Sequence, residues 1–330
     1  MLHRNNFLAY LLIICSFMVL ANSCTAAQET APSSSQVRSG EGALSLGQAA
    51  ILGVVEGLTE YLPVSSTGHL LLAERILAIG HDPSASAEQN ARTKEATDAY
   101  TICIQIGAII AVLGLYFRRV KQMLRGLVGK DTEGRQLLIN VITAFLPAAV
   151  IGLLFNKLIK SYLFGTWPVV LAWFVGGVAI LAVSRWNQNK GDRSAHSGRS
   201  IVELTWQMAL IIGLIQCIAM WPGVSRSLVT IVGGLLVGLS LSAAVEFSFL
   251  LGLITLSAAT GYDALKHGQI MLQTFDALSL AVGVVFAFIA ALLSVKWMVG
   301  YLNRHGLAIF GYYRVALALV VGTLLMTGVL

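Results

Sequence analysis

Long apolar runs separated by short polar loops dominate the chain. Six of these runs are long enough to cross a bilayer as helices, which requires roughly 17–25 residues each. They lie near 100–117, 136–156, 167–184, 243–262, 278–300 and 307–330. This pattern predicts an all-α integral membrane protein with six full transmembrane helices.

Two further apolar segments, near 46–77 and 204–239, are interrupted by proline and by polar residues. Pro63 and Pro222 are expected to break helices. Irregular backbone is tolerated inside a bilayer only where protein or a water-filled cavity surrounds it. We therefore expect two re-entrant helix–loop–helix hairpins, which enter the membrane and return to the same side.

The two interrupted segments are variants of one another at a constant offset of 160 positions. Glu56 aligns with Gln216, and Val64–Ser65 aligns with Val224–Ser225. Doubled, interrupted apolar segments point to the binding site in membrane proteins that are built from inverted repeats. The offset therefore predicts an inverted-topology repeat.

The distribution of charge gives the orientation of the repeats. Three loops are rich in basic residues, and the positive-inside rule places them in the cytoplasm. They contain Arg118, Arg119, Lys121, Arg125, Lys130 and Arg135, then Arg185, Lys190, Arg193 and Arg199, and finally Lys296 and Arg304. With an N-terminus outside the cytoplasm, counting the membrane crossings gives two repeats, 46–185 and 204–330, that run through the membrane in opposite directions. A cytoplasmic linker, 186–203, joins them. Their hairpin tips would meet near the midplane.

Composition supports a membrane protein and excludes other classes. Of the 330 residues, 56% are hydrophobic and 12% charged, against about 25% charged in soluble domains. Because cytoplasmic loops explain the net charge of +6, we expect no nucleic-acid partner. The four cysteines lack metal-binding spacing, and no P-loop or HExxH motif is present.

The N-terminus has the pattern of a secretory signal peptide. His3 and Arg4 precede an apolar stretch and a run of small residues that ends at Ala27. We expect cleavage after residue 26 or 27, followed by a short disordered lead at 28–45. An uncleaved additional span, or a lipoprotein signal at Cys24, remains open.

The first hairpin contains two acids, Glu56 and Glu60, one helical turn apart. Charge within a membrane segment is costly and indicates a functional site by default. Two such carboxylates require a divalent cation, an arginine or a shared proton. The alternative is a solvated helix face.

Hydroxyls follow these acids at the expected start of a new helix. Ser65, Ser66 and Thr67 supply hydroxyls and N–H groups there, which suit an anion. His69 lies about one turn further, and a hydroxyl beside a histidine is the general form of an activated nucleophile. Ordinary helix capping and a buried structural histidine explain the same residues.

The second hairpin supplies positive charge. Arg226 lies between Ser225 and Ser227, with Thr230 one turn later, and arginine suits phosphate oxygens bidentately. A structural pairing of Arg226 with Glu56, Glu60 or Glu246 is the alternative. Gln105 and Glu246 lie within apolar spans, where they would support the site or bond helix to helix.

These motifs resemble the bacterial undecaprenyl-diphosphate phosphatases of the bacitracin-resistance type. Both signatures of that family, and the surrounding stretches, are similar over about 46–330. The matching stretches are Glu56–His69, Pro222–Ser227 with Thr230, Glu246–Leu251, Gln105–Gly107 and Leu146–Ala148. Leu228 and Val229 stand where the family pattern has small residues, and the leader is additional.

The resemblance implies removal of the terminal phosphate of undecaprenyl diphosphate, which recycles the lipid carrier for wall synthesis and confers bacitracin resistance. It implies a site open to the extracytoplasmic side of the bacterial inner membrane. It also implies Mg²⁺ or Ca²⁺ on Glu56 and Glu60, which bind metal or assist acid/base chemistry. Ser66 and His69 would be nucleophile or base. Ser65, Thr67, Ser225, Arg226, Ser227 and Thr230 would surround the diphosphate.

Three questions stay open at the level of sequence. A transporter or flippase of an anionic isoprenoid lipid would show the same repeats, although the concentration of acids, hydroxyls and arginine favours an enzyme. The attacking group is Ser66, activated by His69 or a glutamate, or a metal-bound water. The oligomeric state is also open, a homodimer included.

Overall fold

The computed structural model describes residues 44–79, 86–163, 165–189 and 197–329, and the expected signal peptide and nearly all of the lead lie outside these ranges. Within them the chain is helical, with a single bridge between Arg199 and Leu239. The α-helices are α2 (Leu46–Thr59), α3 (Ser66–Ile76), α4 (Ala87–Leu115), α5 (Phe117–Leu127), α6 (Thr132–Leu163), α7 (Thr166–Asn189), α8 (Trp206–Gln216), α9 (Arg226–Leu236), α10 (Leu241–Thr274), α11 (Ala277–His305) and α12 (Ala308–Met326). Two short 3₁₀ helices, η2 (Ile201–Glu203) and η3 (Cys217–Met220), flank α8.

Six helices, α4, α6, α7, α10, α11 and α12, are long and apolar enough to cross a membrane. The six expected spans are therefore confirmed by length and composition, and the chain is a multi-pass membrane protein. The apolar run at 243–262 covers only part of its helix, because α10 continues to Thr274. Helical hydrogen bonding does not stop where the apolar run stops, since polar residues also sustain a helix.

Helix α5 lies in a segment that the sequence indicated only as a basic loop. It packs against the start of α6, where Gly126 lies against the backbone of Gly134 and Arg135. The absence of a side chain at Gly126 allows this close approach. With eleven residues, α5 is too short and too basic for a search based on apolar runs to find.

Both interrupted segments form helix–turn–helix units: α2 with α3, and α8 with α9. Helices α3 and α9 begin 160 positions apart, and both have eleven residues. Their N-cap residues share a left-handed backbone, with φ 74° and ψ 104° at Ser65 and φ 76° and ψ 115° at Ser225. A positive φ is uncommon for serine, so the two turns repeat an unusual local geometry.

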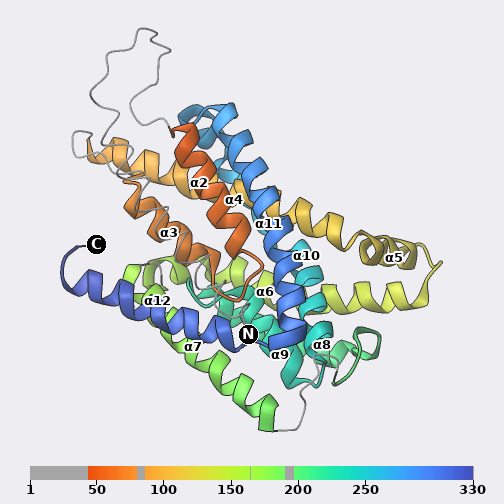
Figure 1. The fold of residues 1–330 in the computed structure, drawn as a ribbon. Helices are drawn as coiled ribbons and strands as arrows, with labels where there is room; N and C mark the ends of the chain where they lie inside the picture. Colours follow the sequence, from red (N-terminus) through yellow and green to blue (C-terminus); the bar gives the residue numbers. More distant parts are fainter. Residues whose placement is uncertain (1–43, 80–85, 164, 190–196, 330) are drawn as a thin grey trace.

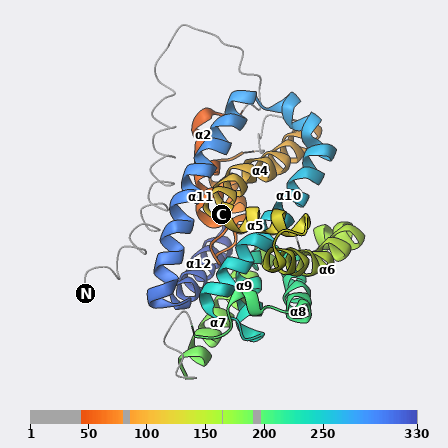
Figure 2. The same ribbon diagram turned by 90° about the vertical axis from the view of Figure 1, so that its right-hand side faces the viewer.

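The first helix of each unit packs against a long helix from the other half of the chain. Helix α2 lies along α11 in both views (Figures 1 and 2), and α8 packs on α6. Glycines permit both contacts, because a Cβ at Gly53 would meet the backbone of Gly283, and one at Gly213 would meet Ala144. This crossed packing brings the two turns together inside the bundle.

Candidate functional site

The turns of the two helical units are in direct contact. The hydroxyl of Ser227 donates a hydrogen bond to the carbonyl oxygen of Leu62 at 2.8 Å, and that of Ser225 donates to the same oxygen at 3.4 Å. Arg314 of α12 donates to the carbonyls of Pro63, at 3.4 Å, and Gly223, at 2.8 Å. One site therefore draws its residues from both halves of the chain.

Glu60 is the centre of the polar contacts between these turns. One of its carboxylate oxygens accepts a hydrogen bond from the hydroxyl of Ser66. The other accepts from Nη2 of Arg226 at 3.2 Å. All three residues are largely buried, so the structure joins a hydroxyl, a carboxylate and a guanidinium in a protected place.

Arg226 is held by more than its ion pair. Its Nη1 donates to the carbonyl of Ser248 at 3.1 Å, and its guanidinium lies 5.4 Å from the ring centroid of Tyr61. Its Nε has no hydrogen-bond partner among the described residues. The arginine therefore keeps one donor available to a ligand.

Glu56 is fully buried at 0% exposure, and neither of its carboxylate oxygens has a hydrogen-bond partner in the described part of the chain. Glu60 and Arg226 act on it through their charges, and the side chain of Gln105 lies close to it without meeting the geometry of a hydrogen bond. A buried polar group left unsatisfied indicates a missing ion, proton or ligand. These free oxygens suit a divalent cation, because Mg²⁺ is commonly held by one or two carboxylates plus substrate phosphates.

The structure offers no complete cage for such a cation. Over the described ranges, no group of three or more His, Cys, Asp or Glu side chains converges. Both oxygens of Glu60 are already engaged, so Glu56 is the better donor of the predicted pair. A cation there would need water or substrate oxygens to complete its coordination.

Both ring nitrogens of His69 contact groups other than the hydroxyl of Ser66. Its Nδ1 lies 2.6 Å from the carbonyl oxygen of Ser65, and its Nε2 lies 2.7 Å from the hydroxyl of Tyr313. A carbonyl oxygen only accepts, so Nδ1 carries a proton. The sequence left His69 and a glutamate open as the group that activates Ser66. Of these, Glu60 is the one whose side chain contacts the Ser66 hydroxyl.

The remaining predicted residues divide between the site and the framework. The hydroxyls of Ser225 and Ser227 contact Leu62 and each other, and Thr230 bonds to Ser248 at 2.7 Å, so these groups cap and join helices. Of the three acids considered as structural partners of Arg226, Glu60 is the one that pairs with it. Glu246 is paired instead, at 2.7 Å, with Arg119 of α5, which the sequence placed in a loop.

A cavity of about 610 Å³ lies beside this cluster, between α3, α4, α7, α10 and α12. Thr67 and Gly68, which follow Ser66 in α3, line it together with Gln105 and Trp173, whereas Ser66, Glu60 and Arg226 are not among its lining residues. Leucine and valine side chains form much of the remaining wall, and its charged lining residues are Glu74, Arg75, Lys94, Asp98 and Asp263. Its size is in the range of ligand pockets.

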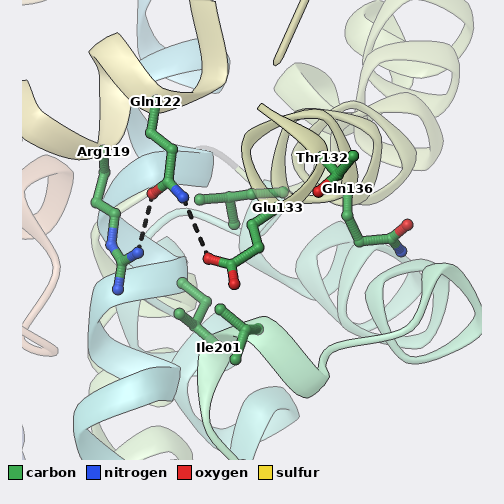
Figure 3. Close-up of a pocket in the computed structure, with 8 residues that line it drawn as sticks. Arg119, Gln122, Thr132, Glu133, Gln136 and Ile201 are labelled. Atoms are coloured by element: carbon green, nitrogen blue, oxygen red, sulfur yellow. Dashed lines mark hydrogen bonds between the residues drawn. The ribbon is translucent and has the colours of Figure 1, made fainter. Parts of the chain in front are cut away.

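A second, smaller pocket of about 200 Å³ lies among α5, α6 and η2 (Figure 3). There Arg119 donates to Gln122 at 3.0 Å, and Gln122 donates to Glu133 at 3.4 Å. The pocket shares no lining residue with the cavity beside Ser66. It contains none of the predicted site residues.

Sequence reasoning missed Trp173, Ser248, Tyr313 and Arg314. Arg314 was detectable, because it is a charge within the apolar run 307–330, and the rule that selected Glu56 applies to it equally. The other three have ordinary residue types for a membrane helix. Only the packing of distant helices reveals their position.

Fold and site together define a class: a multi-pass helical membrane protein with a buried serine–carboxylate–arginine cluster beside a ligand-sized cavity. Residues 49–320 match the family model described as "Bacitracin resistance protein BacA". The chain belongs to this family.

Curated relatives cover most of the chain. A protein of Sorangium cellulosum named undecaprenyl-diphosphatase is 45% identical over 83% of this chain and 84% of its own length. Undecaprenyl-diphosphatase 2 of Rhodospirillum rubrum is 43% identical over 83% of this chain and 93% of its own length. The undecaprenyl-diphosphatase of Rhodopseudomonas palustris is 44% identical over 84% of this chain and 94% of its own length.

Proposed function

We propose that this protein hydrolyses undecaprenyl diphosphate to undecaprenyl phosphate and inorganic phosphate. Its relatives carry the name of that activity. The observation that carries the proposal is the contact of Ser66 and Arg226 with the two oxygens of Glu60. Through this activity the protein would recycle the lipid carrier for wall synthesis and confer bacitracin resistance.

The cluster suits attack by the serine. The hydroxyl of Ser66 would transfer its proton to Glu60 as its oxygen bonds to the terminal phosphorus. The bond from that phosphorus to the bridging oxygen would break, and undecaprenyl phosphate would leave. Water would then cleave the phosphoserine and release phosphate. Phosphoryl transfer requires alignment and neutralisation of charge, which Arg226 and the N-terminus of α3 would supply.

A divalent cation, Mg²⁺ or Ca²⁺, fits the free oxygens of Glu56, with Glu60 beside them. Bound there, it would neutralise charge on the diphosphate. In this arrangement the oxygens of Glu56 would bind the cation and would accept no hydrogen bond from the protein. This accounts for their lack of a hydrogen-bond partner. Gln105 lies near enough to orient it.

The architecture that fits this activity is an inverted repeat with two re-entrant hairpins. The constant offset of 160 positions, the shared backbone at Ser65 and Ser225 and the crossed packing support it. The basic residues of α5 and of the segment after α7 favour a cytoplasmic side for those ends. The cavity would then open to the extracytoplasmic side of the bacterial inner membrane.

Release of phosphate from undecaprenyl diphosphate by the purified protein in detergent, with and without EDTA, tests the proposal. The wild type should release phosphate, EDTA should suppress release, and Ser66→Ala should lower it strongly. No release from the wild type, under conditions that support a relative, would overturn the proposed function.

Repeated hairpins that meet inside a membrane protein are also a transporter architecture. The second candidate is therefore a carrier of an anionic isoprenoid lipid. Proteoliposomes distinguish the two, because a carrier moves the lipid across the bilayer intact. Movement without hydrolysis would favour the carrier.

A further inference from the structure

The first turns of α3 and α9 share a backbone geometry but differ in their capping. At α9, the hydroxyl of Ser225 accepts a hydrogen bond from the N–H of Leu228 at 3.3 Å. At α3, Ser65 makes no such bond within the described structure, and the position equivalent to Leu228 is Gly68. The hydroxyl of Ser66 is engaged with Glu60. The first turn of α3 thus lacks the cap that its counterpart has.

A buried donor without a partner lies beside this open turn. Trp173 of α7 is 1% exposed, and its indole N–H has no hydrogen-bond acceptor among the residues that the structure describes. A Cβ placed at Gly68 would meet the Nε1, Cε2 and Cζ2 atoms of this indole. The edge that carries the N–H therefore lies against α3 at its third residue.

Burial of an indole without a partner for its N–H is unusual, because tryptophan usually finds an acceptor when buried. The indole is a donor only, so its missing partner must be an acceptor. Gly68 and Trp173 both line the cavity beside Ser66. An anion at the start of α3 would satisfy the indole and the uncapped backbone N–H groups together.

We propose that the indole N–H of Trp173 and the first-turn N–H groups of α3 form one anion cradle for the non-bridging oxygens of a phosphoryl group. The inference rests on the proposed function for the identity of that group, the terminal phosphate of the lipid diphosphate. It adds a substrate-binding residue from α7 that belongs to neither hairpin. The absence of a side chain at Gly68 is what allows the indole to reach the turn.

The cradle uses neutral donors beside the charged Arg226. Neutral N–H groups bind phosphate oxygens without forming an ion pair, and Glu60 already occupies the guanidinium of Arg226 in this structure. The two kinds of donor have different neighbours. The rings of Trp173 and His69 have their centroids 5.3 Å apart, and Arg226 lies over Tyr61.

Trp173→Phe tests the cradle, because phenylalanine keeps an aromatic ring and removes the N–H. The matched control is Trp167→Phe, on the same helix but 54% exposed. Loss of a hydrogen bond to a charged group should lower kcat/KM for undecaprenyl diphosphate roughly 10- to 100-fold in Trp173→Phe. The control should remain within about twofold of the wild type, as expected of a surface position.

A binding measurement on the wild type separates ligand contact from packing. In protein labelled with ¹⁵N-tryptophan, the Trp173 indole signal is the one missing from Trp173→Phe, and inorganic phosphate should shift it. The proposal requires both results. An unchanged rate overturns it, and so does a lowered rate without a phosphate-dependent shift, which would reveal a packing role.

The same experiment keeps the two proposals distinguishable. If the wild type hydrolyses undecaprenyl diphosphate and Trp173 fails either requirement, the cradle fails and the proposed function stands. If the wild type hydrolyses nothing, the proposed function fails. The phosphate titration then decides alone whether the cradle exists.

Discussion

At the scale of single residues, Glu60 performs two tasks with its two oxygens. One is placed to take the proton of Ser66, and the other anchors Arg226. Under the proposed function this carboxylate would join the attacking hydroxyl to the charge that stabilises the phosphate, so its removal should affect both. Glu56 has neither contact and is left for a cation or a proton.

Glu60→Gln keeps the shape of this side chain and removes its basicity. We expect kcat to fall by about 10²- to 10⁴-fold, the usual contribution of a general base, while the protein still folds. Phosphate release from the purified variant measures the loss. Glu95→Gln is the control, because Glu95 is half exposed and pairs with His267. A Glu60→Gln variant as active as this control would contradict the role.

Gly68→Ala tests the close approach of Trp173 to α3. The added methyl group would collide with the indole, so we expect a lower thermal midpoint and weaker binding of substrate, with overpacking costing about 1–3 kcal/mol. Gly300→Ala is the control, since nothing lies within 4 Å of a Cβ at that helical position. Equal midpoints for the two variants would show that the indole moves aside freely.

At the scale of elements, α12 joins the turn between α2 and α3 to the turn that precedes α9. Arg314 is fully buried, and besides the carbonyls of Pro63 and Gly223 it donates to Ala172 and Trp173 of α7. One guanidinium therefore joins three elements through four carbonyl oxygens. Its geometry matters as much as its charge.

Arg314→Met should unfold at a distinctly lower temperature in detergent. It leaves four buried carbonyls without this donor, and each such loss costs about 1–3 kcal/mol, so the total should be about 3 kcal/mol or more. Arg314→Lys should rescue little, because a lysine lacks the planar fork. Arg304→Met, at the exposed end of α11, should leave the midpoint unchanged; a similar fall there would remove the special role of Arg314.

At the scale of the whole molecule, hydropathy was sufficient to find the six long helices, and the offset of 160 positions found both helix–turn–helix units. Those features depend on local composition and on duplication, which a sequence displays directly. Whether Glu60 or His69 forms the hydrogen bond with Ser66 depends on side-chain rotamers, and a sequence does not display rotamers. Trp173 and Tyr313 were missed because they reach the site from α7 and α12, far along the chain.

The proposed orientation can be tested with single cysteines in a background whose four native cysteines are replaced by serine. Lys130→Cys, in the basic loop after α5, should react with a membrane-impermeant maleimide only after the cells are permeabilised. Leu265→Cys, on the exposed end of α10, should react in intact cells. The opposite pattern would reverse the topology.

The central claim is that Ser66 from one half of the chain and Arg226 from the other act as a single catalytic unit around Glu60. A double-mutant cycle on kcat/KM for undecaprenyl diphosphate tests it most directly, using Ser66→Ala, Arg226→Gln and the double variant. Residues that act as a unit are strongly non-additive, so the double variant should lose little more activity than the worse single variant. Losses that multiply, as independent sites give, would contradict the account.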